Sequence, residues 1–261
     1  MSESEGPMLI LSSGDQLLQV TTRRRFLGVL GLGGAIVLLP GVFTACKSDK
    51  DTTGPGPTGQ YTLDLSTDTG ILNYAYALEQ LEAAYYTAAL TSAGYAALSA
   101  NEQEVLSDLQ KHEVIHREFL KQVLGSAAIP TIAFSATTVG TTTAGRDVLL
   151  KTSQLLEDTG VSAYNGAGKY LTNAANLLVA GKIVSVEARH AAAIRDIRDG
   201  SNGRLFAGDD VVNAQGLDVK AEPDTVLTSV VSLNVVTSPL SIGTLPAQGK
   251  RTADQPAPAP V

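Results

Sequence analysis

Two Glu-x-x-His motifs constrain this 261-residue chain more than any other feature of its sequence. They are Glu113-x-x-His116 and Glu187-x-x-His190, and each lies in a long stretch whose apolar residues recur at helical spacing. Residues three apart share one face of a helix, so each motif presents a carboxylate and an imidazole side by side. A lone glutamate, Glu79 or Glu157, precedes each motif in a separate helical stretch.

Four glutamates and two histidines, distributed in this order over four helices, form the ligand set of a dinuclear metal site inside a four-helix bundle. The predicted metal ligands are Glu79, Glu113, His116, Glu157, Glu187 and His190. Two divalent cations would balance four carboxylates, and carboxylates combined with imidazoles favour Fe, Mn or Zn over Ca or Mg. The predicted cofactor is therefore a pair of Fe or Mn ions, which could react with O₂ or peroxide.

Helical periodicity predicts four long helices, near residues 68–92, 99–125, 144–170 and 173–199. Ser99 and Glu102 form a capping-box pattern at the start of the second helix. In the second and fourth helices, both motifs occupy core positions of an apolar stripe. Residues 126–143 contain a proline and β-branched residues without helical period. They therefore predict a long crossover between the second and third helices.

The two halves of the helical region resemble one another. Aligning Glu79 with Glu157 also aligns Tyr86 with Tyr164, seven residues further along each helix. This alignment favours Glu79 as the ligand on the first helix, although Glu82 lies one turn along on nearly the same face and stays an alternative. Tyr86 and Tyr164 are candidates for hydrogen-bonding or redox residues beside the site, with ordinary aromatic packing as the alternative.

Other polar residues of the predicted helices are assigned to the surface. His112 lies about 100° round the helix from Glu113, which predicts a surface residue or a neighbour of the site rather than a ligand. Arg189, Arg195 and Arg198 are predicted to form a solvated face of the fourth helix.

The pattern resembles the ferritin-like superfamily over residues 66–200, and most closely its exported ferritin-like-domain branch. The similarity is carried by the stretches LNYAYALEQLEAAYY (72–86), HEVIH (112–116), LLEDTGVSAYNGA (155–167) and VEARHAA (186–192). FAGDDVV (206–212) and SIGTLPA (241–247) weakly resemble the same branch and plant desiccation-related proteins. The resemblance implies an all-α, ferritin-like four-helix bundle with the six residues above on the dinuclear ligand positions. It is closer to di-iron oxidases, rubrerythrins and manganese catalases than to iron-storage cages.

Residues 1–45 have the features of an export signal. The segment from Thr22 to Leu27, with Arg23 and Arg24, resembles the twin-arginine motif that bacteria use to export folded proteins. The uncharged run 28–42 is short and glycine-rich for a membrane span. Cys46 follows a lipoprotein-like cleavage site, with soluble secretion as the alternative. These features predict the twin-arginine machinery as a partner, a membrane anchor at Cys46, and a periplasmic or cell-surface lipoprotein.

Composition divides the rest of the chain into a flexible linker at 46–65, the bundle at 66–200 and a C-terminal extension at 201–261. The extension is predicted to be mostly loop, with a short helix near residues 225–232. The chain that follows the predicted signal keeps the formal net charge of −7 and has no basic cluster, which argues against a nucleic-acid partner. The oligomeric state stays open, and a homo-oligomer is compatible with the sequence.

Three classes of function are compatible with these features. The first is a dinuclear oxidoreductase, for example a ferroxidase, peroxidase or catalase-like enzyme, that acts on Fe(II), O₂ or peroxide. The second is a metal-binding or desiccation-protective protein without turnover. The third is a metal-free bundle with a structural or interaction role. The sequence identifies neither an organic substrate nor a catalytic residue.

Overall fold

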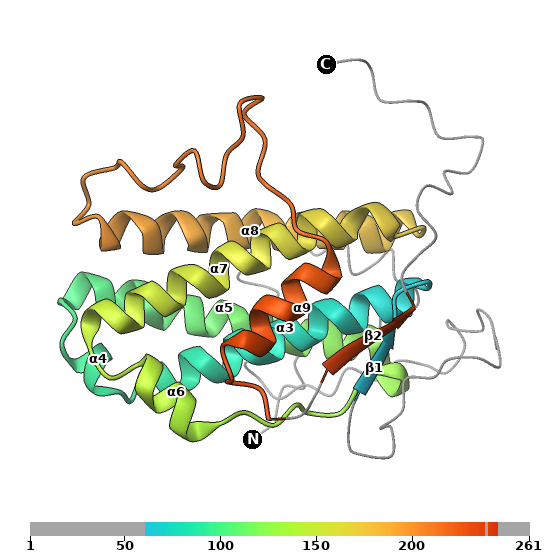
Figure 1. Ribbon diagram of the computed structural model, residues 1–261, viewed down its shortest axis with the longest axis horizontal. Helices are drawn as coiled ribbons and strands as arrows, with labels where there is room; N and C mark the ends of the chain where they lie inside the picture. The colour runs from blue at the N-terminus through green and yellow to red at the C-terminus, as the bar shows by residue number, and fades with distance from the viewer. Residues whose placement is uncertain (1–60, 238–239, 245–261) are drawn as a thin grey trace, which may run out of the picture. The chain divides into compact units, whose positions relative to one another are not determined.

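The computed structural model describes residues 61–237 and 240–244. The predicted export signal, Arg23, Arg24 and Cys46 lie outside the described residues. Four long helices dominate the described part: α3 (Asp68–Ala89), α5 (Ala100–Leu124), α7 (Arg146–Ala167) and α8 (Ala174–Arg198). α3 packs on α5 and α7 on α8, and contacts of α3 with α7 and of α5 with α8 join the two hairpins (Figure 1). The predicted all-α bundle is confirmed.

Three of the four long helices, α3, α5 and α8, begin at a residue whose side chain accepts a hydrogen bond from a backbone N–H of the first turn. The predicted capping box forms on α5, where Ser99 accepts from the N–H of Glu102 and the Glu102 carboxylate accepts from the N–H of Ser99. Thr67 caps α3 by accepting from the N–H of Gly70, and Asn173 caps α8 by accepting from the N–H of Ala175. α3 ends three residues before the predicted position, and a single turn, α4 (Ala93–Ala96), follows it. Among the described helices, none combines the length and hydrophobicity that crossing a bilayer requires.

The crossover between the hairpins runs along α3, and two buried amide side chains attach it there. Asn73 donates to the carbonyl of Ala127 and accepts from the N–H of Ile129, both at 2.8 Å. Two turns further along α3, the side-chain oxygen of Gln80 accepts from the N–H of Ile132 at 2.8 Å. These side chains thus provide hydrogen-bond partners for backbone groups of the crossover that no helix or strand satisfies.

The crossover also contains a short helix, α6 (Ala136–Thr142), where the sequence predicts none. Ser135 caps it by accepting from the N–H of Thr138. The buried side chain of Val139 holds it against the core. Seven residues make too few turns for helical periodicity to be visible, which explains why the prediction was wrong for this segment.

A small two-stranded sheet lies beside the bundle (Figure 1). β1 (Tyr61–Asp64) pairs in parallel with β2 (Leu240–Thr244). Leu63 and Leu65 have no exposed surface. The predicted linker, 46–65, is therefore wrong over residues 61–65, because burial of two leucines fixes that segment in the fold. The predicted C-terminal loop is likewise interrupted by β2.

The C-terminal extension packs against α7 through a close backbone approach. The structure places its predicted short helix at α9 (Pro223–Ser232), which contacts α7. Just before α9, the N–H of Ala221 donates to the carbonyl of Ser162 at 2.9 Å. A Cβ atom at Gly166 would lie 1.8 Å from the carbonyl oxygen of Ala221, so only glycine permits this contact.

A buried arginine joins the extension to the bundle. Arg195 on α8 is 3% exposed, and its guanidinium donates to both carboxylate oxygens of Asp158 on α7 at 2.8 and 2.7 Å. It also donates to Asp210 at 3.1 and 2.6 Å and to the carbonyl of Leu205. The prediction of a solvated arginine face is wrong for Arg195, because three acceptors from outside α8 surround it.

Candidate metal centre

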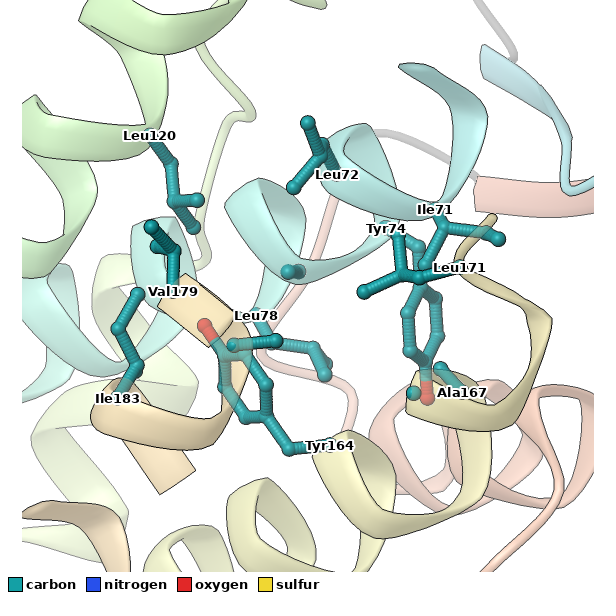
Figure 2. A pocket seen from close by; sticks show the side chains of 13 residues that line it. Ile71, Leu72, Tyr74, Leu78, Leu120, Tyr164, Ala167, Leu171, Val179 and Ile183 are labelled. Atoms are coloured by element: carbon teal, nitrogen blue, oxygen red, sulfur yellow. The ribbon is translucent and has the colours of Figure 1, made fainter. Parts of the chain in front are cut away.

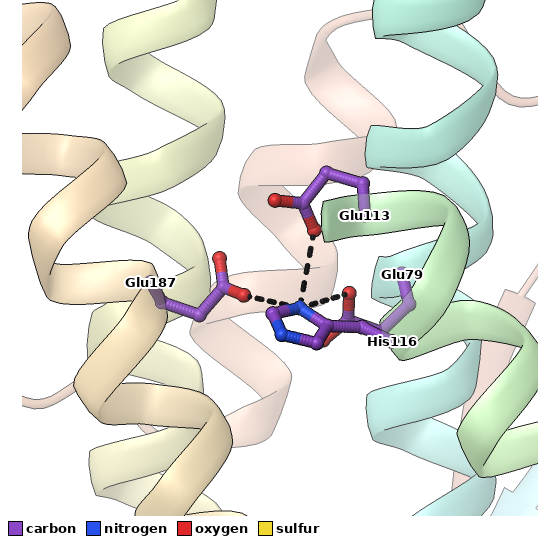
Figure 3. Close-up of side chains that lie close together, drawn as sticks. All are labelled: Glu79, Glu113, His116 and Glu187. Atoms are coloured by element: carbon purple, nitrogen blue, oxygen red, sulfur yellow. Dashed lines mark ion pairs between the residues drawn. The ribbon is translucent and has the colours of Figure 1, made fainter. Parts of the chain in front are cut away.

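The six predicted ligands meet in the interior of the bundle, and each of the four long helices contributes at least one of them. Glu79 comes from α3, Glu113 and His116 from α5, Glu157 from α7, and Glu187 and His190 from α8. All four glutamates have no exposed surface. Figure 3 shows one half of the cluster, in which residues from α3, α5 and α8 point toward one another.

The six residues form two overlapping groups. Glu79, Glu113, His116 and Glu187 make the first group, and within it one ligand atom from each residue lies within 4.8 Å of the others. Glu113, Glu157, Glu187 and His190 make the second group by the same criterion. Glu113 and Glu187 belong to both groups. The two shared carboxylates join both groups into one buried cluster that could hold metal.

In the first group, Nδ1 of His116 faces three carboxylates (Figure 3). It lies 2.8 Å from Oε1 of Glu187, 3.5 Å from Oε2 of Glu79 and 3.6 Å from Oε2 of Glu113. The imidazole is held here because His116 follows Glu113 by three residues on α5, with the two side chains on one face of the helix.

The second group repeats this geometry around Nδ1 of His190. This atom lies 2.8 Å from Oε1 of Glu113, 3.4 Å from Oε2 of Glu157 and 3.8 Å from Oε2 of Glu187. In each group, the shortest approach joins a histidine of one hairpin to a motif glutamate of the other hairpin. The two hairpins must therefore be packed together before either group is complete.

The atoms that face the centre lack ordinary hydrogen bonds. The short approaches between the imidazole nitrogens and the carboxylates are ion-pair contacts and not hydrogen bonds. The buried atoms without a hydrogen-bond partner include Glu79 Oε2, both carboxylate oxygens of Glu113 and Glu187, Glu157 Oε2, and Nδ1 of His116 and His190. Buried polar atoms are normally satisfied, so a cluster of unsatisfied oxygen and nitrogen donors fits metal ions, which they would coordinate.

The electrostatics of the cluster point the same way. Burial raises the pKa of Glu113 well above its usual 4.5, and that of Glu157 to about 7. Burial also opposes ionisation of Glu187, but His116 and His190 outweigh it and lower the pKa of Glu187 to about 2. Burial lowers the pKa of His190, but Glu157 and Glu113 outweigh it and raise that pKa to about 12. Charged imidazoles thus offset the carboxylates where metal cations could do so.

Two tyrosines hold the outer oxygens of the end glutamates. The hydroxyl of Tyr86 on α3 donates to Oε1 of Glu157 on α7 at 2.6 Å. The hydroxyl of Tyr164 on α7 donates to Oε1 of Glu79 on α3, also at 2.6 Å. Both tyrosines are buried, so each one packs in the core and also forms a hydrogen bond beside the centre. These bonds orient each carboxylate and leave its second oxygen free to face the centre.

His112 contacts the centre through His190. Nδ1 of His112 lies 2.9 Å from Nε2 of His190, and the two rings are stacked. His112 itself is exposed and belongs to neither group of donors, as its place on the helix predicts. This contact holds the ring of His190 in place and keeps Nδ1 directed at the carboxylates.

Glu82, the alternative ligand on α3, and Gly160, which the sequence did not single out, also border the site. Glu82 is 3% exposed and belongs to neither group of donors, whereas Glu79, the preferred candidate on α3, belongs to the first. Burial raises the pKa of Glu82 well above 4.5, and repulsion from Glu187 adds to this. A Cβ atom at Gly160 would lie 3.0 Å from Oε1 of Glu82. The internal repeat could have pointed to this pair, because it aligns Gly160 with Glu82.

A small apolar cavity of about 20 Å³ lies beside the centre (Figure 2). Aliphatic side chains from α3, α5 and α8, among them Leu78, Leu120 and Ile183, line it together with the ring of Tyr164. Because Tyr164 also donates to Glu79, the cavity and the centre share this residue. The volume suits a single small molecule, and the apolar lining favours an uncharged one.

A comparison with models of known protein families matches the helical part of the chain. The model of a family described as a ferritin-like domain matches residues 67–199, about half of the chain. The matched segment includes all four long helices and all six residues of the two groups. No curated protein matches the chain.

Proposed function

This chain belongs to the ferritin-like domain family, and on that premise we propose that it binds two Fe or Mn ions and performs oxidoreductase chemistry with Fe(II), O₂ or peroxide. The observation that carries the proposal is the pair of overlapping donor groups that share Glu113 and Glu187. One such group alone would support a mononuclear site, whereas two with shared carboxylates support a dinuclear one.

The protein residues around the centre have roles that suit this chemistry. When bound, two Fe or Mn ions supply the electrons and coordination positions that reaction with O₂ or peroxide requires. The four buried glutamates and two histidines would hold the ions, and the closed bundle keeps bulk water from them. The apolar cavity beside Tyr164 supports a small uncharged reactant such as O₂.

The burial of the centre also favours a second candidate, a protein that holds metal without turnover. The imidazole of His190 is 4% exposed and that of His116 is 12% exposed. A site closed to this extent admits no large substrate, so metal retention or protection against stress would be its use.

Metal analysis followed by activity assays distinguishes these functions. Protein purified from its native host is expected to contain two Fe or Mn ions per chain and to turn over Fe(II) with O₂, or peroxide. The control replaces Glu79, Glu113, Glu157 and Glu187 by Gln, which removes the ligand charge but keeps the side-chain shape. Two metal ions without turnover would support the second candidate. Absence of metal, with stability unaffected by chelator, would contradict both.

We further propose that the protein is exported through the twin-arginine route and anchored to a membrane at Cys46. The support is the N-terminal sequence alone, with Arg23 and Arg24 before an uncharged run and a cysteine. Replacing both arginines by Lys is expected to retain the precursor in the cytoplasm. Replacing Cys46 by Ala is expected to release the exported domain from membranes. Cell fractionation measures both results, and unchanged fractions in both variants would refute the proposal.

A further inference from the structure

Glu82 is a fifth buried carboxylate next to the six predicted ligands. It lies on α3, one turn beyond Glu79, and is 3% exposed. Within the described part of the chain, no hydrogen bond or ion pair engages its carboxylate. The nearby charges that act on it belong to other glutamates, with Glu187 first and then Glu113. Glu82 therefore faces the centre without a protein partner that would stabilise its charge.

Gly160 provides the space that the Glu82 carboxylate occupies. A Cβ atom at position 160 would lie 3.0 Å from Oε1 of Glu82 and 3.5 Å from Oε2 of Glu187. The two oxygens thus border the same small volume on the α7 side of the centre. In the internal repeat Gly160 aligns with Glu82 itself, so one half of the chain supplies an additional carboxylate and the other half supplies the room for it.

Burial keeps the Glu82 carboxyl neutral unless a cation lies beside it to stabilise its charged form. An isolated charged group taken out of water costs several kcal/mol unless a partner compensates it. A core leucine or methionine at position 82 would avoid that cost and would pack well on α3. Protein cations do not approach Glu82 in the described residues, but a metal ion held by Glu187 would lie beside it.

We propose that Glu82 is a seventh protein ligand of the dinuclear centre, a fifth carboxylate that binds one metal ion on the side where Gly160 leaves room. The inference rests on the proposed function, because it requires that the centre binds metal. It goes further because it predicts that the two halves of the centre contain different numbers of carboxylate ligands. Five carboxylates would face two ions, and the additional one comes from α3.

Two variants test this proposal by Mn(II) titration of the otherwise unchanged protein. Glu82→Gln removes the charge while keeping the shape, and Gly160→Ala displaces the Glu82 carboxylate without removing it. Both are expected to weaken binding of at least one Mn(II) ion by about 10- to 100-fold, the range for residues that position or complete a metal site. A structure of the Mn(II)-loaded protein is expected to show a Glu82 oxygen at bonding distance, roughly 2.0–2.5 Å from the ion.

Matched controls separate ligation from changes in charge or helix stability. Glu104→Gln removes an exposed glutamate of α5, and Gly181→Ala changes a helical glycine of α8 whose added Cβ would meet no atom within 4 Å. Neither should alter Mn(II) affinity. Wild-type affinity in both Glu82→Gln and Gly160→Ala, with two ions bound, would overturn the role of Glu82 but leave the proposed function intact. A wild-type protein that binds no Fe(II) or Mn(II) would overturn both.

Discussion

Replacing His190 by Ala is expected to abolish most of the stabilisation that this protein gains from added Fe(II) or Mn(II). Nδ1 of His190 lies within 3.8 Å of three carboxylates, so its loss removes the nitrogen donor of one group. A ligand at 100 times its Kd stabilises the native state by about 2.7 kcal/mol, and each bound ion should contribute on this scale. The measurement is the Tm of wild type and variant, with and without added metal.

The matched control is Ile194→Ala, a truncation one turn further along α8. Ile194 has no exposed surface and belongs to neither group of donors. This control should lose about 2–5 kcal/mol by leaving a cavity, yet its Tm should still rise with metal. An equal rise with metal in His190→Ala and wild type would rule out His190 as a ligand.

The His190→Ala variant should also lose stability without metal. Carboxylates raise the pKa of His190 to about 12, so the charged imidazole stabilises the native state. Because the folded pKa is raised, this contribution is fully present below about pH 6.5, the usual pKa of histidine. It is lost as the pH rises toward 12. The difference between the metal-free proteins should therefore be larger at pH 6 than at pH 10.

Replacing Arg195 by Met is expected to destabilise the protein and to loosen its C-terminal extension. The variant leaves Asp158 and Asp210 without the guanidinium that now binds both. We expect a loss of about 3 kcal/mol in the free energy of unfolding, the lower end of the range for a broken buried ion pair. The lower end applies because the side chain of Asp210 is 64% exposed. Urea unfolding measures the loss.

An exposed arginine of the same helix provides the control for this prediction. Among the described residues, Arg189 bonds only to Ser185, one turn earlier on α8, so Arg189→Met should change stability by less than about 0.5 kcal/mol. Limited proteolysis should then cut the segment 200–222 faster in Arg195→Met than in Arg189→Met. Similar unfolding curves and cleavage rates in the two variants would show that the Arg195 bonds do not hold the extension.

The six predicted ligands could be found from sequence because their signal is periodic. A glutamate and a histidine three residues apart on an otherwise apolar stripe would be buried, and burying them costs free energy unless they bind a partner. This pattern occurs twice in the chain. The repeat that pairs Glu79 with Glu157 also pairs Tyr86 with Tyr164, and the structure joins these residues crosswise. The periodicity of apolar residues within single helices was therefore enough to predict most of the bundle and of its interior.

The remaining features depend on contacts between segments far apart in the chain. Arg195 has the spacing of a surface residue on α8, and only the docking of Asp210 and Leu205 buries it. The pairing of β1 with β2 joins residues at opposite ends of the described chain. In the sequence nothing distinguishes Gly160 from other helical glycines, and its role shows only once the position of Glu82 across the bundle is known. One-dimensional patterns carry no information about such partners.

The crossed bonds of Tyr86 to Glu157 and of Tyr164 to Glu79 have a consequence for how such a protein could be built. Each half of the chain supplies the hydroxyl that orients the carboxylate of the other half. One hairpin taken alone would lack the orienting groups for its own glutamate, but two copies of the same hairpin would supply them to each other. The crossover at 125–145 therefore brings the two hairpins together within one polypeptide. Self-association of a single ancestral or designed hairpin would bring them together from two polypeptides.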